Sequence, residues 1–287
     1  MPSLKDIRKR ISSVKNTQKI TKAMKLVSAA KLRRAQDAML QLRPYAAKHR
    51  EMLESLAAQL GGDEAPHPLL QAHDEVKRVG VLALSSDRGM CGAFNSQIIK
   101  RTQQYVKSRG DVAVAVYPLG RRMVTAMEKG VAEVPEAFGE IIPATSTETI
   151  RHITDTLVDG FLKGELDEVV IVSNRFRSAI SQEAAVLPLL PVTPEGEADE
   201  VGGEMIYEPD QTALLQYVVP RYIEVQIRQA ILESIAGEHA ARMNAMNNAT
   251  DNASEMIGSL TLQMNRARQA AITTELMEII GGAEALK

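Results

Sequence analysis

The sequence predicts an α/β protein in which two long terminal helices form an antiparallel coiled coil around a small inserted α/β domain. Two observations predict this fold class. Residues 3–60 and 210–287 each contain one proline and carry apolar residues at helical spacing, whereas short apolar runs alternate with amphipathic stretches between them. A helix of ~55 residues spans roughly 80 Å, which is more than the core of a compact domain needs.

The first helix is predicted over residues 5–60. Pro44 interrupts its pattern, so we expect a kink or a short break near Leu42 and Arg43. Its seam residues recur in steps of three, four or seven: Ile7, Ile11, Val14, Thr21, Met24, Ser28, Ala35 and Leu42.

The middle of the chain, residues 76–190, is predicted to form a small Rossmann-like α/β domain. A further strand over residues 178–190 should form a hairpin with the strand before it. Residues 61–75 and 191–208 are rich in Pro and Gly and should connect this domain to the helices. The other expected strands cover residues 79–84, 112–116 and 169–173, and the expected helices cover 93–108, 121–128 and 147–162.

The final helix completes a discontinuous shaft made of residues 1–60 and 209–287. Asp210 follows Pro209 and is a credible N-cap, and Pro220 should bend the early turns. Its expected seam residues are Ala253, Met256, Leu260, Met264, Ala267 and Ala271.

Charge is unevenly distributed along the chain. The net charge is −2, but residues 1–50 contain fourteen Lys or Arg against two Asp or Glu, a net of +12, so the remainder carries −14. A basic helix of this kind fits an acidic protein partner, a nucleic-acid arm, a transit peptide or a solvated face. The acidic remainder and the lack of interleaved aromatic residues disfavour nucleic acid.

No catalytic, cofactor or metal site is predicted. The loop 85–92 follows an apolar strand and opens a helix, but it lacks the P-loop ending and the dinucleotide glycine spacing. We therefore interpret it as a packing turn, and Cys91, the one cysteine, as a small buried thiol. The five histidines show no metal-ligand spacing.

Three motifs resemble the signatures of one family, the gamma subunits of rotary F-type ATP synthases, in the same order along the chain. They are residues 10–25 (RISSVKNTQKITKAMK) with 29–36 (AAKLRRAQ), residues 85–95 (SSDRGMCGAFN), and residues 267–276 (ARQAAITTEL) with 282–283 (GA).

The resemblance implies a non-catalytic rotor that couples ion flow through a membrane c-ring to ATP synthesis or hydrolysis. In such proteins the paired helices turn inside a ring of three alpha and three beta subunits. The α/β domain, here the foot domain of residues 76–190, and the foot of the shaft bind epsilon and the c-ring. We expect one copy per complex, no cofactor, no nucleic acid and no membrane span. The expected location is peripheral, on the cytoplasmic face of the bacterial plasma membrane.

The resemblance also implies site residues. Lys19, Lys22, Met24 and Lys25 match the region coupled to the beta lever, and Arg242 matches another coupling position. The alternatives are solvated lysines and, for Met24 and Thr273, seam residues. The remaining matches are Arg268 and Gln269 for a beta-subunit loop, Thr273 and Glu275 for the opposite coupling segment, and Met205, Tyr207 and Glu208 for the foot facing epsilon and the c-ring.

Two other function classes stay open on the residues alone. An α/β nucleotide-binding protein with helical extensions would bind ATP saturably in isolation. A coiled-coil nucleic-acid scaffold would bind DNA or RNA with an affinity that falls steeply with salt.

Overall fold

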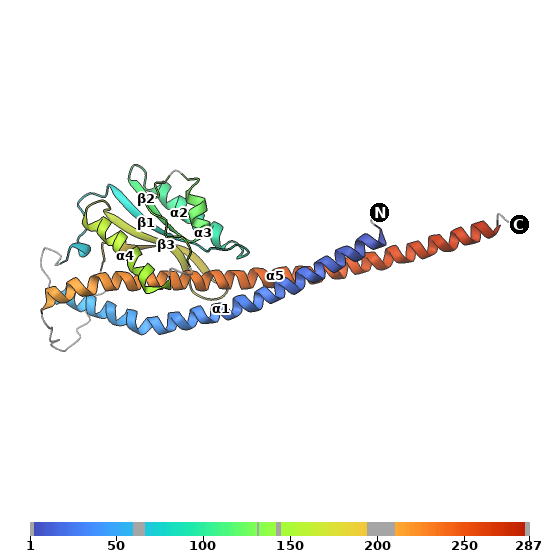
Figure 1. The fold of residues 1–287 in the computed structure, drawn as a ribbon, viewed down its shortest axis with the longest axis horizontal. Coiled ribbons are helices and arrows are strands. Elements are labelled where there is room, and N and C mark those ends of the chain that lie inside the picture. The colour runs from blue at the N-terminus through green and yellow to red at the C-terminus, as the bar shows by residue number, and fades with distance from the viewer. Residues whose placement is uncertain (1–2, 60–66, 131, 142–144, 194–209, 285–287) are drawn as a thin grey trace. The chain divides into compact units, whose positions relative to one another are not determined.

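The computed structural model describes residues 3–59, 67–130, 132–141, 145–193 and 210–284. The chain divides into two compact units. The terminal unit comprises Met1–Ser28 and Arg242–Lys287, and the central unit comprises Ala29–Ala241. Helical N- and C-terminal segments thus accompany a central mixed sheet, which confirms the coarse fold class (Figure 1).

Two helices contribute to both units, α1 (Leu4–Gln59) and α5 (Gln211–Glu284). The predicted cap is confirmed, because the amide of Ala213 donates to Asp210 Oδ1 at 2.8 Å. The alternative of a break beside Pro44 is wrong, since α1 runs through the proline. Leu53 and Leu56, each 1% exposed, are buried in the central core beyond it, and their burial offsets the lost helical hydrogen bond.

The sheet of the central unit has four strands in the order β2-β1-β3-β4. β1 (Arg78–Leu84) pairs in parallel with β2 (Ala113–Leu119) and with β3 (Glu168–Phe176). The predicted hairpin is confirmed, because β4 (Gln182–Leu190) pairs antiparallel with β3.

The hairpin turn is longer than the sequence suggested. The predicted strand from residue 178 begins instead at Gln182, because Arg177 and Ser178 donate their amides to the carbonyl of Ser181 at 3.3 and 3.0 Å. Those two bonds close a turn at the position expected for the start of the strand.

Helices cover both faces of the sheet (Figure 1). One face packs against α2 (Phe94–Ser108) and α3 (Arg121–Met127) through a core that includes Val81 and Phe94. The other face packs against α4 (Thr147–Leu162), α1 and α5 through a larger core that includes Leu82 and Ile227. Both faces of the sheet are therefore buried against helices.

In the terminal unit, α1 and α5 pack through Ile7, Ile11 and Leu260. Met256 was predicted to lie in this seam but is 46% exposed, so that assignment is wrong. Half-buried Ile257 takes the position, because it keeps alternating steps of four and three between Ala253 and Leu260.

Asp167 connects three segments at the amino edge of the sheet. Its carboxylate accepts hydrogen bonds from His73 Nδ1 and from the amides of Lys77 and Arg78, each at 2.8 Å. Burial of the carboxyl opposes ionisation, but these bonds outweigh it and lower the pKa of Asp167. His73 in turn stacks on Phe161 of α4, with ring centroids 4.6 Å apart.

At the other edge, α5 lies against β3. Gly237 permits the approach, because a Cβ there would lie 2.4 Å from Asn174 Oδ1 and 3.3 Å from the ring of Phe94. Asn174 is 1% exposed, so its side chain has little room to yield. One helical turn earlier, Glu233 accepts the amide of Phe176 at 3.4 Å.

We expect Asp167→Asn to lower the free energy of unfolding by about 1–3 kcal/mol at neutral pH, because an amide cannot accept all three bonds. The folded-state pKa lies below the unfolded one. The contribution is therefore present above pH ~4 and is lost as the pH falls through the folded-state value. Urea unfolding at several pH values measures this difference, which must narrow in acid. Exposed Asp74→Asn is the control and should change stability by less than about 0.5 kcal/mol.

We expect Gly237→Ala to destabilise the chain by about 1–3 kcal/mol, because the new methyl group overlaps buried Asn174. Gly258→Ala in the same helix is the matched control. Nothing lies within 4 Å of its added Cβ, so it should stabilise by about 0.5–1 kcal/mol through helix propensity. The urea midpoints of unfolding of both variants measure these effects. Equal shifts in the same direction would contradict the close packing of Gly237 against Asn174.

Candidate functional site

At the carboxyl edge of the parallel strands, where open α/β sheets usually bind ligands, side-chain hydrogen bonds hold the loop that follows β1. Ser85 Oγ accepts the amide of Met123 at 2.7 Å, and Ser86 Oγ donates to Asn95 Oδ1 at 2.9 Å. Asp87 Oδ1 accepts the amides of the residues that flank it in space, Arg121 at 3.1 Å and Ile141 at 3.0 Å. These bonds tie the loop 85–92 to α2, to α3 and to Ile141, as a packing turn requires.

Cys91 is buried, as predicted, at 1% exposure. Its Sγ accepts a hydrogen bond from the side-chain nitrogen Nδ2 of Asn95 at 3.2 Å, so the thiol belongs to the hydrogen-bond network of this turn. Among the described residues, no group of three or more His, Cys, Asp or Glu could hold a metal ion. Likewise, no described helix is both long and apolar enough to cross a membrane.

The terminal unit contains a ladder of polar pairs between its two helices. Gln18 Nε2 donates to Ser254 Oγ at 2.6 Å, the hydroxyls of Thr21 and Thr250 lie 2.8 Å apart, and Lys25 Nζ donates to Asn247 Oδ1 at 2.6 Å. We call these three pairs the polar ladder. As the residue on α1 advances from 18 to 25, its partner on α5 retreats from 254 to 247, so the pairing is antiparallel in a single register.

The predicted lever residues of α1 fall into two groups. Lys19 and Lys22 are exposed and have no hydrogen bond or ion pair to another described residue. Met24 and Lys25 are half-buried, and Lys25 already uses its ammonium within the polar ladder. On α5, Arg242 is 8% exposed, which makes it part of the helix packing.

Beyond the polar ladder, α5 extends past the residue at which α1 begins. The register carried back to Leu4, where α1 begins, reaches approximately Arg268. From Ala271 to Glu284, α5 therefore has no residue of α1 beside it, and we call this stretch the tip. Its apolar side chains are half or more exposed: Ile272, Leu276, Met277, Ile279 and Ile280. An exposed apolar group of this kind marks a surface that another molecule covers.

The predicted partner-binding residues of α5 lie at or beside the tip. Arg268, Gln269, Thr273 and Glu275 are all exposed. Thr273 donates its hydroxyl to the carbonyl of Gln269 at 2.9 Å, so it bonds its own helix. Its exposure disagrees with the alternative of a seam residue.

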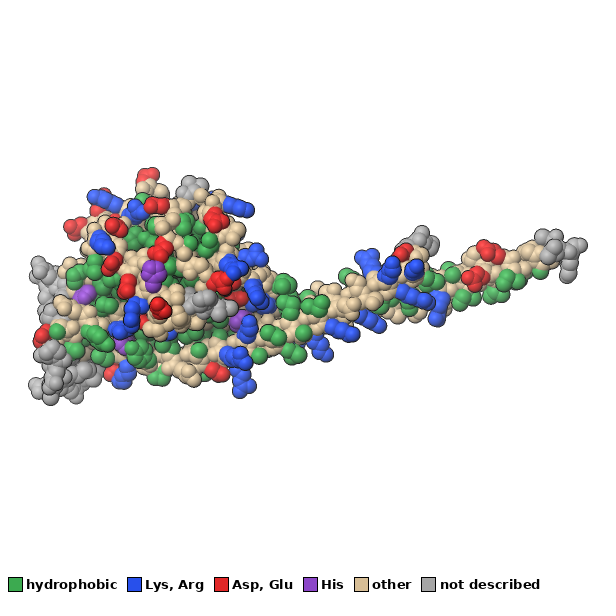
Figure 2. Space-filling model, viewed as in Figure 1, with side chains coloured by type: hydrophobic (Ala, Val, Ile, Leu, Met, Phe, Trp, Pro, Cys, Tyr) green, Lys and Arg blue, Asp and Glu red, His purple; other side chains and the backbone are tan. Residues whose placement is uncertain are grey.

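Positive charge gathers on the outer face of α1. In the terminal unit α1 carries one acidic residue, Asp6, which bonds Ser3 at the helix start. Figure 2 shows blue Lys and Arg side chains along the exposed helical part, beside green apolar atoms. The exposed cations of α1 in this unit are Lys5, Arg8, Lys9, Arg10, Lys15, Lys19 and Lys22. None of them forms an ion pair with another described residue, so the surface suits an acidic partner.

Three predicted foot residues, Met205, Tyr207 and Glu208, lie outside the described residues. Conversely, the sequence interpretation missed two features. Gln18, Thr21 and Lys25 keep the alternating steps of the seam, and this spacing could have identified the polar ladder. It also missed a groove beside α1 and α5 in the central unit, since no local motif signals a cavity between distant segments.

Comparison with known proteins places these features in context. A family model described as ATP synthase matches residues 3–286. The "ATP synthase gamma chain" of Trichlorobacter lovleyi is 48% identical over 291 residues, covering 100% of both chains. The protein of the same name from Chlorobium phaeobacteroides is 46% identical over 295 residues, covering 100% of this chain and 99% of that one.

Solved structures resemble the fold. A chain of the Euglena gracilis mitochondrial ATP synthase, described as OSCP/F1/c-ring, matches with a TM-score of 0.66 and 20% identity, over 99% of this chain and 94% of that one. A chain of the Tetrahymena thermophila mitochondrial ATP synthase central stalk and c-ring matches with a TM-score of 0.62 and 24% identity, over 80% and 99%.

The polar ladder makes a testable contribution to stability. We expect Lys25→Met and Asn247→Leu each to destabilise the chain, because each removes the bond from Lys25 Nζ to Asn247 Oδ1. Asn247→Leu also removes the bond from Asn247 Nδ2 to Asp251 Oδ2 at 3.0 Å. The double variant should be less destabilised than the sum, by about 0.5–1.5 kcal/mol. Urea unfolding followed by helical circular dichroism gives the four values. Lys22→Met with Asn248→Leu, both exposed, is the control pair and should be additive.

Proposed function

Because the chain belongs to the ATP synthase gamma-chain family and is a rotor subunit of the central stalk, we propose that its helix pair turns as an asymmetric shaft inside a ring of three alpha and three beta subunits. Rotation driven by ion flow through the c-ring would then bias each catalytic site of the ring in turn. The single observation that carries this proposal is the tip, which exposes apolar side chains with no cover from α1.

We take the shaft to be a left-handed coiled coil of residues 1–60 and 209–287. Support comes from a series of buried and half-buried positions of α1 that alternates in steps of four and three, the repeat that makes helices supercoil. Those positions are Ile7, Ile11, Val14, Gln18, Thr21, Lys25 and Ser28. On α5 the same steps join Ala253, Ile257, Leu260, Met264 and Ala267.

Asymmetry is needed because three identical beta subunits can respond differently only to a shaft that differs from side to side. In the terminal unit the outer face of α1 is basic, whereas α5 exposes Asp251 and Glu255 at the same height of the pair. A rotating shaft of this kind would present a different chemistry to each subunit. Lys19 and Lys22 are proposed contacts for an acidic beta lever, because their charges are exposed and unpaired within the described chain.

The structure narrows the proposed roles of three other residues. Lys25 and Arg242 are proposed to act on coupling through the geometry of the helix pair, since one is bound in the polar ladder and the other is buried. Met24 is half-buried and can contribute to both packing and contact. Exposed Arg268, Gln269, Thr273 and Glu275 remain proposed direct contacts of the beta subunits.

The central unit is proposed to be a Rossmann-like foot, residues 76–190, joined to the shaft by residues 61–75 and 191–208. Its proposed partners are epsilon and the c-ring, with Met205, Tyr207 and Glu208 facing them. The proposed location is the cytoplasmic face of the bacterial plasma membrane, with one copy per complex. Catalysis would lie on the ring, and this chain would contribute no catalytic group. Nucleotide binding by the chain itself is not favoured, because its relatives are ATP synthase gamma chains and the side chains of the loop 85–92 are engaged by neighbouring helices.

Reconstitution tests the proposal. The purified chain alone should hydrolyse no ATP, and adding it to alpha and beta subunits of a bacterial relative should give a stable complex with steady turnover. Saturable ATP hydrolysis by the chain alone, or failure to alter the activity of alpha and beta, would contradict the rotor mechanism.

Arg268→Glu should weaken association with the ring by about tenfold or more, because it reverses a charge at the proposed beta-subunit contact. Arg266→Glu is the matched control, since it is also exposed, changes net charge equally and points from a different side of the helix. Size-exclusion chromatography and ATP turnover measure both variants. Equal loss in the two would mean that net charge, rather than this contact, governs assembly.

A further inference from the structure

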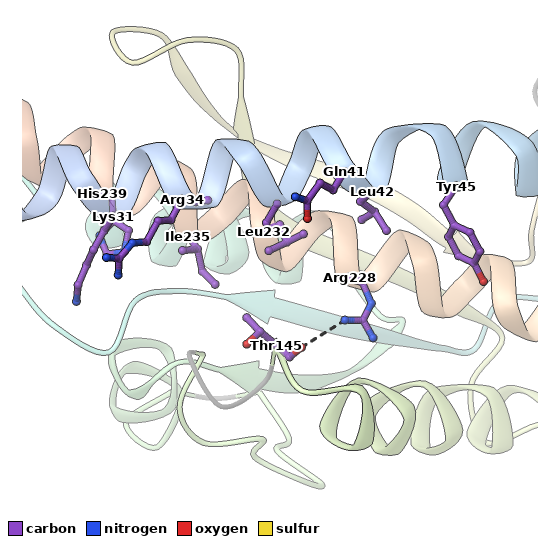
Figure 3. A pocket seen from close by; sticks show the side chains of 12 residues that line it. Lys31, Arg34, Gln41, Leu42, Tyr45, Thr145, Arg228, Leu232, Ile235 and His239 are labelled. Carbon is purple, nitrogen blue, oxygen red and sulfur yellow. Dashed lines mark hydrogen bonds between the residues drawn. The ribbon is translucent and has the colours of Figure 1, made fainter.

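A groove of about 840 Å³ lies in the central unit beside α1 and α5 (Figure 3). It is independent of the tip and of the polar ladder, and neither the resemblance nor the proposed rotor function accounts for it. The volume falls within the ~300–1,000 Å³ range of sites that bind small molecules.

Both helices line the groove with regular stripes. On α1 the stripe runs from Lys31 to Tyr45, which spans ~21 Å of helix. On α5 it runs from Arg228 to His239 in steps of four, three and four. Apolar side chains occupy the middle of both stripes: Ala35, Ala38, Leu42, Leu232 and Ile235. Four of these are only half-buried, so a ligand could remove further apolar surface from water.

The charged groups that line the groove are all cations, and no Asp or Glu lines it; the other polar lining residues are Gln41, Tyr45, Thr145 and His239. Figure 3 shows Lys31 and Arg34 together with His239 at one end, and Tyr45 at the other. Lys31 and Arg34 are exposed and form no hydrogen bond or ion pair with another described residue. They are available to hold an anion at that end of the groove.

The remaining arginine of the groove is already engaged. Arg228 donates to the carbonyl of Thr145 at 3.3 Å and to Thr147 Oγ1 at 3.2 Å, and it lies 3.8 Å from Glu224 Oε1. Arg228 therefore stabilises the wall of the groove, and Lys31 and Arg34 at the opposite end are the cations that can bind an anion.

We infer that this groove binds a long-chain monocarboxylate, with its head group on Lys31 and Arg34 and its tail along the apolar middle towards Tyr45. An elongated ligand with one charged end matches an elongated groove with one pair of unpaired cations. An acidic protein helix is the alternative occupant, but a stable protein contact requires more than about 1,000 Å² of buried surface. Twelve residues line this open groove, fewer than the roughly 20–30 a side of a stable protein interface, so the smaller ligand is favoured.

The probe is sodium laurate, titrated below its micelle concentration into the full chain and followed by calorimetry. We expect one site per chain, with Arg34→Gln raising the Kd by about tenfold or more through loss of a charge-assisted hydrogen bond. Arg33→Gln is the matched control, because Arg33 is its exposed neighbour outside the groove and the charge change is the same. Equal affinity of the two variants would overturn the inference.

A second pair of variants tests the tail. Ala38→Phe should abolish binding by filling the apolar middle, while Leu40→Phe, at a position 57% exposed and outside the groove, should not. Dodecylammonium, with the same tail and the opposite charge, should not bind. Binding of dodecylammonium as tight as that of laurate would overturn the inference, as would binding of phosphatidylglycerol vesicles in place of laurate monomers.

The complex reconstituted with alpha and beta should retain the site. If the free chain binds laurate and the assembled complex does not, another subunit covers the groove. The groove is then a protein contact and the inference is overturned. This outcome is separable from failure of the rotor proposal, because turnover of the complex is measured independently of laurate binding.

Discussion

The fold depends on the double use of a single helix. In the central unit α5 supplies one layer of the larger core, with Leu215, Ile223, Ile227 and Ile231 fully buried. In the terminal unit the same helix supplies half of a seam whose period is set by Ala253 and Leu260. Each unit thus constrains the sequence of one continuous element, which has to be apolar over a broad face in one place and along a narrow stripe in the other.

Local periodicity predicted most of this architecture, because helix and strand periods are written in neighbouring residues. The parallel strands, the hairpin and the Asp210 cap follow from short-range patterns. Pro44 shows a limit of prediction from neighbouring residues. The helix continues through this proline because Leu53 and Leu56, later in the same helix, are buried in the central core. Met256 and its neighbour Ile257 are both apolar, so the sequence of α5 alone does not show which of them packs in the seam. The packing of α1 against α5 leaves Met256 exposed.

The candidate site was predictable in position but not in detail. Motif resemblance indicated Lys19, Lys22 and Lys25 together, yet the fold separates them into two exposed charges and one that binds Asn247. Exposure of the tip could not be predicted, because it depends on where α1 begins relative to the end of α5. The groove beside the helices requires the tertiary arrangement of segments as distant as Lys31, Thr145 and Arg228.

The uncovered tip also bears on how such a protein is handled before it has partners. Ile272, Leu276 and Ile279 form an exposed apolar surface that another apolar surface can cover, including the tip of a second copy. Free chains would therefore tend to associate with one another, and correct assembly competes with that loss at a rate that rises with their concentration. Synthesis of this chain together with its partner subunits, or shortly after them, would keep the apolar tip covered and limit this self-association.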